Sequence, residues 1–335
     1  MTTKLTNSRI LVTGGAGFIG SHLTDKLLSL GHNVTVIDNF ANGKKENLHE
    51  ASKSENFKLI EGDILSKADC DRVTEGVDFV FHLACLGVRH SLHSPFENHR
   101  VNAEGTLNLL ESARKYNVKH FFYISTSEIY GRTKSFPIIE LSETKPLTVY
   151  GASKLVGEHY THSYKECFDL NSTVLRIFNN YGPRAHYEGD AGEVIPRSIV
   201  RILNNEQPIV FGKGDITRDF YFVKDTAATL ASLIPLREQL IGETINIGTG
   251  EEISMKLLLK KLLKSMGKEA LGLKFLPDRP ADVPRLWVNN TKFKQLVNFT
   301  PQYSFEAGLA ETIAFYIELS KSKNLINEVK ETNWK

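Results

Sequence analysis

Short apolar runs alternate with longer segments of helical apolar spacing through the first half of the chain. The runs are rich in Val, Ile and Phe and predict β-strands at 10–13, 33–37, 57–61, 77–83 and 120–125. Helical spacing of apolar residues predicts helices at 21–30, 95–116, 150–168 and, near the end of the sequence, 304–320. Parallel strands need a crossover between them, so this alternation indicates an α/β fold with a doubly wound parallel sheet.

Three glycines separate the first predicted strand from the first predicted helix. Gly14 permits a tight turn, Gly17 lets backbone N–H groups approach a pyrophosphate, and Gly20 lets the helix pack close to the strand. The start of the helix adds partial positive charge for phosphates. Glycines also occur in plain turns, but the strand before them and the helix after them favour a dinucleotide site.

An acidic residue follows the second predicted strand. Asp38 comes 18 residues after Gly20, close to the spacing of a carboxylate that binds ribose hydroxyls. Such a carboxylate repels a 2′-phosphate, which favours NAD over NADP, although Lys44 and Lys45 are close by. After the third strand, Asp63 is either an adenine contact or a turn residue.

Two sets of polar residues predict a catalytic centre. Tyr150 and Lys154 share one face of a helix, so the ammonium can stabilise a phenolate whose pKa is otherwise about 10. This pair is suited to moving a proton during alcohol oxidation, although the same spacing occurs on solvated helices. Thr126, Ser127 and Glu128 follow the fifth strand, at the edge where parallel sheets bind ligands.

Together these motifs resemble the nucleotide-sugar epimerase/dehydratase branch of the extended short-chain dehydrogenases/reductases, from about Arg9 to Tyr316. The resemblance implies a Rossmann-type fold with bound NAD. It makes Tyr150 the base that takes a proton from a sugar hydroxyl at C4, with Lys154 on the nicotinamide ribose and Thr126 on the reacting hydroxyl. The expected cofactor contacts are Gly14, Gly17, Phe18, Ile19, Gly20, Asp38, Asn39, Asp63, Ile64, Leu83, Ala84, Tyr150 and Lys154.

The same resemblance assigns the second half to the nucleotide sugar, with UDP-sugars the commonest of the branch. Arginines suit phosphate because their rigid fork matches its oxygens. The expected substrate contacts are Arg89, Ser91, Asn179, Val194, Arg218 and Arg285.

The predicted units are an NAD-binding domain at 1–178, a smaller C-terminal α/β substrate lobe at 179–320 that returns some segments to the sheet, and a polar, frayed tail at 321–335. Members of the branch are usually homodimers joined through the helices matching 95–116 and 150–168. Asn102 matches a position of the branch that supports the active-site backbone, and the alternative is an asparagine that ends a helical turn.

The reaction that follows C4 oxidation depends on two residues. Glu128 is placed to act on the C5 proton, which a C4 ketone acidifies, and this favours a C5/C6 step slightly. Ser127 stands where 4,6-dehydratases of the branch carry an acid, so Thr126-Ser127-Glu128 resembles UDP-glucuronate decarboxylases and some dehydratases of N-acetylated sugars. The loop around Arg89 resembles that of 4-epimerases instead, and Arg89 either recognises a C6 carboxylate or faces solvent. Glu128 is otherwise a structural acid bound to loop amides.

Composition and charge exclude several classes of function and location. The 335 residues carry a formal net charge of +2, which argues against nucleic-acid or membrane-surface binding. Three cysteines without metal-ligand spacing predict reduced thiols, no metal and a cytoplasmic location. No apolar run approaches the roughly 20 residues of a membrane span, and the first residues lack the apolar region of a signal peptide. A non-catalytic NAD-binding module is the remaining alternative, but such proteins usually lack the Tyr or the Lys.

Overall fold

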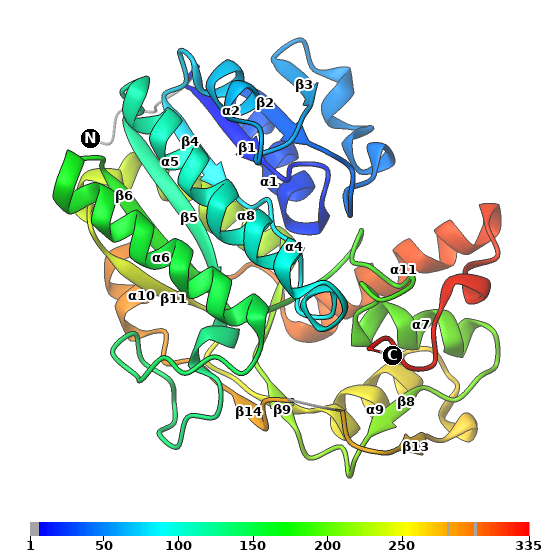
Figure 1. The fold of residues 1–335 in the computed structure, drawn as a ribbon. Helices are drawn as coiled ribbons and strands as arrows, with labels where there is room; N and C mark the ends of the chain where they lie inside the picture. Colours follow the sequence, from blue (N-terminus) through cyan, green and yellow to red (C-terminus); the bar gives the residue numbers. More distant parts are fainter. Residues whose placement is uncertain (1–6, 280–281, 298–299, 335) are drawn as a thin grey trace.

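A seven-stranded parallel sheet forms the centre of the molecule (Figure 1). The computed structural model describes residues 7–279, 282–297 and 300–334, so residues 1–6, 280–281, 298–299 and 335 lie outside the described residues. The strand order is β11-β6-β5-β4-β1-β2-β3, and every pair is parallel. The strands are β1 (Arg9–Thr13), β2 (Asn33–Asp38), β3 (Phe57–Glu61), β4 (Phe79–His82), β5 (His120–Thr126), β6 (Ser172–Ile177) and β11 (Thr244–Ile247).

Helices cover both faces of this sheet, as the alternation of strands and helices predicts. One face packs against α1 (Phe18–Ser29), α8 (Val223–Ser232) and α10 (Thr291–Val297), through buried residues such as Leu23 and Leu230. The other packs against α2 (Lys67–Thr74), α5 (Gly105–Lys115) and α6 (Val149–Phe168), through Leu109 and Leu110 among others. The predicted doubly wound parallel sheet is confirmed.

The strand order reverses beside β1. The chain builds β1, β2 and β3 outward in one direction, then crosses back to place β4, β5 and β6 on the other side of β1. A crevice forms at the carboxyl ends of the strands where such a reversal occurs, and this is where doubly wound folds bind their ligands. Thr13 and His82 end the two strands that flank this point and are joined by a 2.7 Å hydrogen bond.

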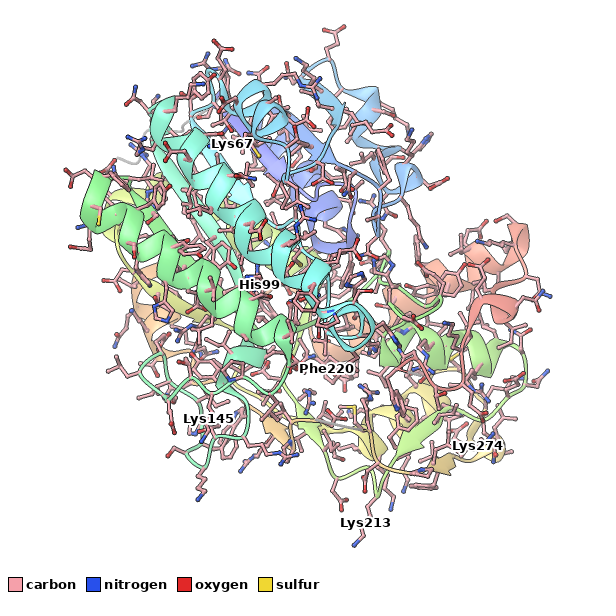
Figure 2. All side chains as sticks on the ribbon, in the orientation of Figure 1. Lys67, His99, Lys145, Lys213, Phe220 and Lys274 are labelled. Atoms are coloured by element: carbon pink, nitrogen blue, oxygen red, sulfur yellow. The ribbon has the colours of Figure 1, made fainter. Side chains whose placement is uncertain are left out.

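A second hydrophobic core lies beside the sheet. It is built on Ile199, Leu262 and Tyr316 from α7 (Val194–Leu203), α9 (Met255–Ser265) and α11 (Phe305–Ser322). Three small sheets accompany it, and Phe220 lies inside while Lys213 projects outward (Figure 2). Their strands are β7 (Asn179–Tyr181) with β10 (Phe220–Phe222), β8 (Ile209–Phe211) with β13 (Lys274–Leu276), and β9 (Thr217–Arg218) between β12 (Ile253–Ser254) and β14 (Arg285–Leu286).

Two local predictions need correction. The helix predicted at 95–116 is three segments in succession: α4 (Pro95–His99), a π-helical turn at Arg100–Glu104, and α5. The tail predicted to fray is instead packed, because Leu325 is 1% exposed and Asn333 is fully buried. The division of the chain into units at 178 and 320 stays a prediction, although β11 does return to the main sheet beside β6. Among the described residues, no helix is long and apolar enough to cross a membrane.

Candidate active site

A cleft of about 1100 Å³ crosses the carboxyl ends of the strands and extends to the second core. Every residue predicted to contact the cofactor lines it, from Gly14 to Lys154. The predicted catalytic residues Thr126, Ser127 and Glu128 line it as well, as do Arg89, Asn179, Val194 and Arg218. The fold therefore brings residues of both halves of the sequence to one site.

The glycine turn has no room for side chains. Gly14 has φ +68°, in the left-handed region that favours glycine, and a Cβ there would lie 2.8 Å from the Ala84 Cα. A Cβ on Gly20 would lie 2.2 Å from the Gly14 carbonyl oxygen. The turn thus exposes backbone N–H groups at the start of α1, and this arrangement fits the pyrophosphate of a dinucleotide.

Asp38 ends β2 beside this turn. Its carboxylate accepts hydrogen bonds from the Ala16 N–H at 2.9 Å and the Phe40 N–H at 2.8 Å. Burial raises the pKa of this carboxyl, and the two backbone hydrogen bonds act in the opposite direction. The acid is therefore fixed in place at the edge of the cleft, as a ribose-binding role requires.

The two lysines that weakened the case for NAD are paired with acids. The Lys44 ammonium lies 2.7 Å from Glu188, and the Lys45 ammonium lies 3.2 Å from Glu61. Cations already paired in this way offer less to a 2′-phosphate, so the local charges favour NAD. Asp63 acts partly as a turn residue, since it accepts a hydrogen bond from the Leu65 N–H at 2.8 Å.

Tyr150 opens α6, which Thr148 caps by accepting a hydrogen bond from the Gly151 N–H. Burial raises the Tyr150 pKa well above its ordinary value, Cys85 raises it further, and a hydrogen bond with Thr126 lowers it. Lys154 is 2% exposed, and its ammonium lies 4.2 Å from the centre of the Tyr123 ring. Burial lowers the Lys154 pKa.

No direct Tyr150–Lys154 hydrogen bond occurs among the described residues, and the predicted effect of Lys154 on the Tyr150 phenolate stays a prediction. Their side chains line the same cleft, but Lys154 stacks over Tyr123 instead. Burial disfavours both the charged phenolate of Tyr150 and the charged ammonium of Lys154.

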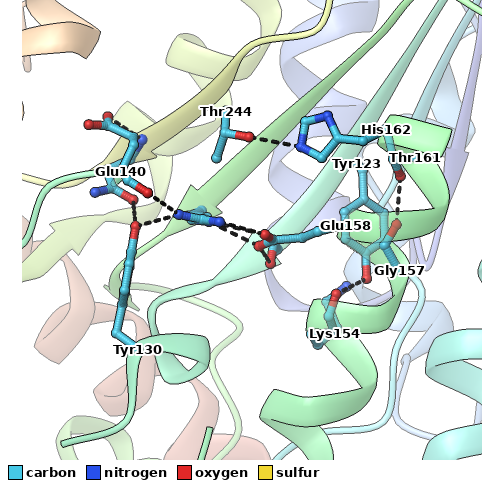
Figure 3. Close-up of polar contacts among 12 residues, drawn as sticks. Tyr123, Tyr130, Glu140, Lys154, Gly157, Glu158, Thr161, His162 and Thr244 are labelled. Carbon is cyan, nitrogen blue, oxygen red and sulfur yellow. Dashed lines mark hydrogen bonds and ion pairs between the residues drawn. The ribbon is translucent and has the colours of Figure 1, made fainter. Parts of the chain in front are cut away.

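The turn that carries Thr126, Ser127 and Glu128, here called the catalytic turn, is joined to a buried polar network, of which Figure 3 shows Tyr130 and Glu158. Ser125, immediately before Thr126, donates a short hydrogen bond to Glu158 of α6. Glu158 also accepts from Arg176 of β6 at 2.7 Å, and Arg176 donates to the Tyr130 hydroxyl at 2.8 Å. Ser125 and Tyr130 bracket the turn in sequence, so this network fixes both of its ends.

Asn102 supports the active-site backbone, which resolves the alternative left open by its sequence. It is 1% exposed, accepts from the Leu86 N–H at 2.8 Å and donates to the Leu86 carbonyl at 3.0 Å. It also donates to Ser153, the neighbour of Lys154, at 3.2 Å. Asn98, which the sequence analysis missed, donates to the carbonyls of Leu86 and Gly87.

The Glu128 carboxylate lies in the cleft, and none of the described residues donates a hydrogen bond to it. Its own N–H donates to the Thr126 hydroxyl at 3.2 Å. Burial raises the pKa of the carboxyl, whereas the charges of Arg218, Arg279 and Arg89 lower it. The alternative role of an acid bound to loop amides therefore lacks its hydrogen bonds.

Arginines converge on the far part of the cleft. Arg218 donates to Asp282 at 2.7 Å and to the Val283 carbonyl at 2.7 Å. Arg89 lines the cleft rather than facing bulk solvent, and burial lowers its pKa to about 10. The buried Oδ1 of Asn179 has no hydrogen-bond partner among the described residues, which leaves it available to a ligand.

Two predicted substrate contacts lie elsewhere. Arg285 is paired with Glu252 at 2.7 Å and lies outside the cleft. Arg279, a few residues earlier in the sequence, lines the cleft instead. Ser91 is buried and donates to the Val88 carbonyl at 2.6 Å, so it stabilises the loop that carries Arg89. Other lining residues to which the sequence analysis assigned no role are Glu193, Phe211 and Trp334.

Comparison with known proteins adds to this geometry. A family model described as GDP-mannose 4,6 dehydratase matches residues 11–312. A putative UDP-glucose 4-epimerase of Methanocaldococcus jannaschii is 35% identical over 306 residues, 91% of this chain and 97% of that protein. UDP-N-acetyl-alpha-D-glucosaminuronate decarboxylase of Bacillus cytotoxicus is 36% identical over 333 residues, 93% of this chain and 98% of that protein. The crystal structure of UDP-glucuronic acid 4-epimerase from Bacillus cereus, in complex with UDP-glucuronic acid and NAD, has a TM-score of 0.86 at 33% identity and covers 93% of this chain and 99% of its own.

Proposed function

Because the chain belongs to the nucleotide-sugar epimerase and dehydratase family of extended short-chain dehydrogenases/reductases, we propose that it oxidises a nucleotide sugar at C4 and then acts at C5 and C6. The first step needs a dinucleotide, and the glycine turn and Asp38 fit NAD. When bound, NAD supplies the acceptor and later the donor of the hydride.

Tyr150 is the base of the first step. It takes the proton of the C4 hydroxyl, and Thr126, whose hydroxyl lowers the Tyr150 pKa, holds that C4 hydroxyl in line. Lys154 holds the nicotinamide ribose, and its ammonium together with the positive ring of the oxidised cofactor offsets the burial that keeps Tyr150 protonated.

The observation that carries the second step is the Glu128 carboxylate, which lies in the cleft without a hydrogen bond from any described residue. In a dehydration it takes the C5 proton as the C6 hydroxyl leaves. In a decarboxylation it returns a proton to C5 after C6 has left as carbon dioxide and the C4 ketone has taken up the electrons. The pKa of this carboxyl is raised by burial, and such a shift suits a group that must exchange a proton near neutral pH.

Decarboxylation of a nucleotide uronate is the form that fits Ser127 best. Loss of carbon dioxide needs no acid at a leaving hydroxyl, whereas loss of water does, and Ser127 is a poor acid. Arg89 lines the cleft together with Glu128 and Arg279, whose charges act on it. Arg89 is the cation that we assign to the C6 carboxylate.

The nucleoside diphosphate lies against the second core in this proposal, and UDP is the form we expect. Arg218 and Arg279 supply the cations for the diphosphate, and the unpaired Asn179 Oδ1 accepts a hydrogen bond from the substrate. The enzyme is proposed to act as a homodimer, since α4 and α6 carry the exposed apolar residues Phe96 and Phe168.

A simple 4-epimerase is the second candidate. Two of the proteins compared above are named as 4-epimerases, one of them putatively. In that reaction the 4-keto sugar turns over in the cleft before reduction, and Glu128 has no chemical part.

The test is a product analysis of the purified protein with UDP-glucose, UDP-N-acetylglucosamine and UDP-glucuronate in separate reactions without added NAD. Mass spectrometry is expected to detect loss of carbon dioxide or of water in at least one reaction. A product of unchanged mass with inverted C4 would make the enzyme an epimerase. The absence of any change in all three would overturn the proposal for UDP-sugars.

A further inference from the structure

The last described residues, 323–334, pack against the second core, and one of them, Trp334, lines the cleft. Arg197 of α7 donates to the backbone carbonyls of Lys330 and Glu331, the latter at 3.0 Å. The Lys330 ammonium lies 2.8 Å from Asp190, and Leu325 is 1% exposed. Figure 1 shows this segment beside α7, on the lobe away from the β1–α1 turn. It therefore lies at the end of the cleft opposite the proposed cofactor site.

Asn333 fixes the position of the residue that follows it. Its side chain is fully buried, and its amide donates to the Gly192 carbonyl at 2.7 Å and to the Asp190 carbonyl at 3.3 Å. These bonds tie the segment to the loop before α7. The next residue, Trp334, lines the cleft with its side chain only partly covered.

Trp334 forms an aromatic corner with Phe211 of β8. The two ring centres are 4.6 Å apart and the ring planes meet at 78°. The Arg279 guanidinium lies 5.3 Å from the Trp334 ring centre and 5.2 Å from that of Phe211. A flat ring stacked on one member of such a corner presents its edge to the other, while the cation remains beside both. This combination of aromatic faces and an adjacent phosphate-binding cation suits a nucleoside diphosphate.

We propose that Trp334 contacts the nucleobase of the substrate, and that residues 323–334 form the outer wall of the nucleoside end of the cleft. The proposal rests on the proposed function, because it requires a nucleotide-linked substrate. It adds a binding residue from a segment whose sequence appeared to be a polar tail. Base stacking on an aromatic side chain contributes about 1–3 kcal/mol by alanine substitution. At 1.4 kcal/mol per tenfold change in affinity, this corresponds to about 5- to 140-fold in Kd.

The chain has only two tryptophans, so fluorescence can report on Trp334 alone. Trp287 does not line the cleft, and its indole N–H donates to the Gly250 carbonyl at 2.8 Å. In the Trp287→Phe protein, titration with UDP is expected to change the emission of Trp334 saturably. In the Trp334→Phe protein, the emission of Trp287 is expected to stay constant. Constant emission from Trp334, while calorimetry of the same sample detects UDP binding, would overturn the proposal.

Affinity gives the second readout. Trp334→Ala is expected to raise the Kd for UDP and the KM for the nucleotide sugar by about 5- to 140-fold, with kcat and the content of bound NAD unchanged. Trp287→Ala is the matched control and is expected to leave the Kd for UDP unchanged. Equal UDP affinity in the wild type and in the folded Trp334→Ala protein would overturn the proposal and leave the proposed function intact. Failure of the wild type to bind UDP, TDP, GDP or ADP would overturn both.

If Trp334→Ala disturbs folding, Asn333→Ala in the Trp287→Phe background tests the same wall without removing the ring. Losing the bonds to Asp190 and Gly192 releases Trp334 from its corner, so the emission change on adding UDP is expected to shrink and the Kd to rise. An unchanged emission response to UDP would contradict the positioning role of Asn333 and the proposal that residues 323–334 form a wall of the cleft.

Discussion

Glu158 on α6 and Arg176 on β6 form a buried ion pair beneath the catalytic turn, with Arg176 Nη2 2.7 Å from Glu158 Oε2. The two side chains are 2% and 9% exposed. Through Ser125 on one side and Tyr130 on the other, the pair connects the helix that carries Tyr150 to the strand end that carries Thr126 and Glu128. The proposed catalytic groups of α6 and of the end of β5 are thus held by one network.

Breaking this pair is expected to cost much more than breaking a surface pair. Glu158→Gln leaves Arg176 buried without its counter-charge, and the free energy of unfolding should fall by about 3–5 kcal/mol in urea titrations. Glu318→Gln is the control, because its pair with Lys321 is exposed on both sides, and no measurable loss is expected there. Equal effects of the two substitutions would contradict the role given to the network.

Tyr150→Phe tests the proton transfer at C4. The variant keeps the ring but loses the hydroxyl, so kcat should fall by about 10²- to 10⁴-fold while bound NAD and UDP affinity stay as in the wild type. Tyr160→Phe is the matched control on the same helix, since Tyr160 does not line the cleft. Turnover within twofold of the wild type in the Tyr150→Phe protein would contradict the role of Tyr150 as the base at C4.

Buried histidines should make the protein less stable in mild acid. Burial lowers the pKa of His120 to about 3, against about 6.5 when unfolded. As the pH falls below about 6.5, His120 becomes protonated in the unfolded chain but stays neutral in the folded protein. The free energy of unfolding therefore falls by about 2 kcal/mol by pH 5. His120→Gln removes this titration, so its stability should depend less steeply on pH between 7.5 and 5 in urea titrations. Parallel pH curves for the two proteins would refute the assignment.

The proposed dimer has a direct test in solution. Phe96 of α4 is 87% exposed, and the proposal covers it with a second copy of the chain. Phe96→Asp should convert a dimer into a monomer at micromolar concentration in size-exclusion chromatography with light scattering. Leu257→Asp, at a 49% exposed apolar residue of α9, should leave the dimer intact. A monomeric wild type would contradict the proposal.

Where the sequence carries a strong physical signal, prediction and structure agree. Strands β1, β4 and β5 are nearly continuous apolar runs because both of their faces are buried, so these strands and the ligand-binding edge could be predicted. Gly14, Tyr150 and Thr126 then fell into one cleft. The family, the sheet and the assignment as an enzyme are confirmed by the fold and by the matches over more than 90% of the chain.

Where neighbouring residues share the same chemistry, the sequence could not choose between them. Arg279 and Arg285 lie close together in the sequence, and only the fold reveals that Glu252, distant in sequence, pairs with Arg285. The packed segment at 323–334 was missed for another reason. Arg197 binds its backbone carbonyls, and backbone recognition leaves no mark in the amino acids recognised.

Incorporation of solvent deuterium tests the central claim most directly. The substrate turned over in the product analysis would be incubated with the enzyme in D₂O, and the product examined by mass spectrometry and NMR. Both C5/C6 reactions leave one carbon-bound deuterium at C5, because the proton placed there comes from Glu128, which exchanges with solvent. We therefore expect one deuterium at C5 in the wild-type product and no such product from Glu128→Gln. A product inverted at C4 without carbon-bound deuterium would contradict the account and identify a 4-epimerase.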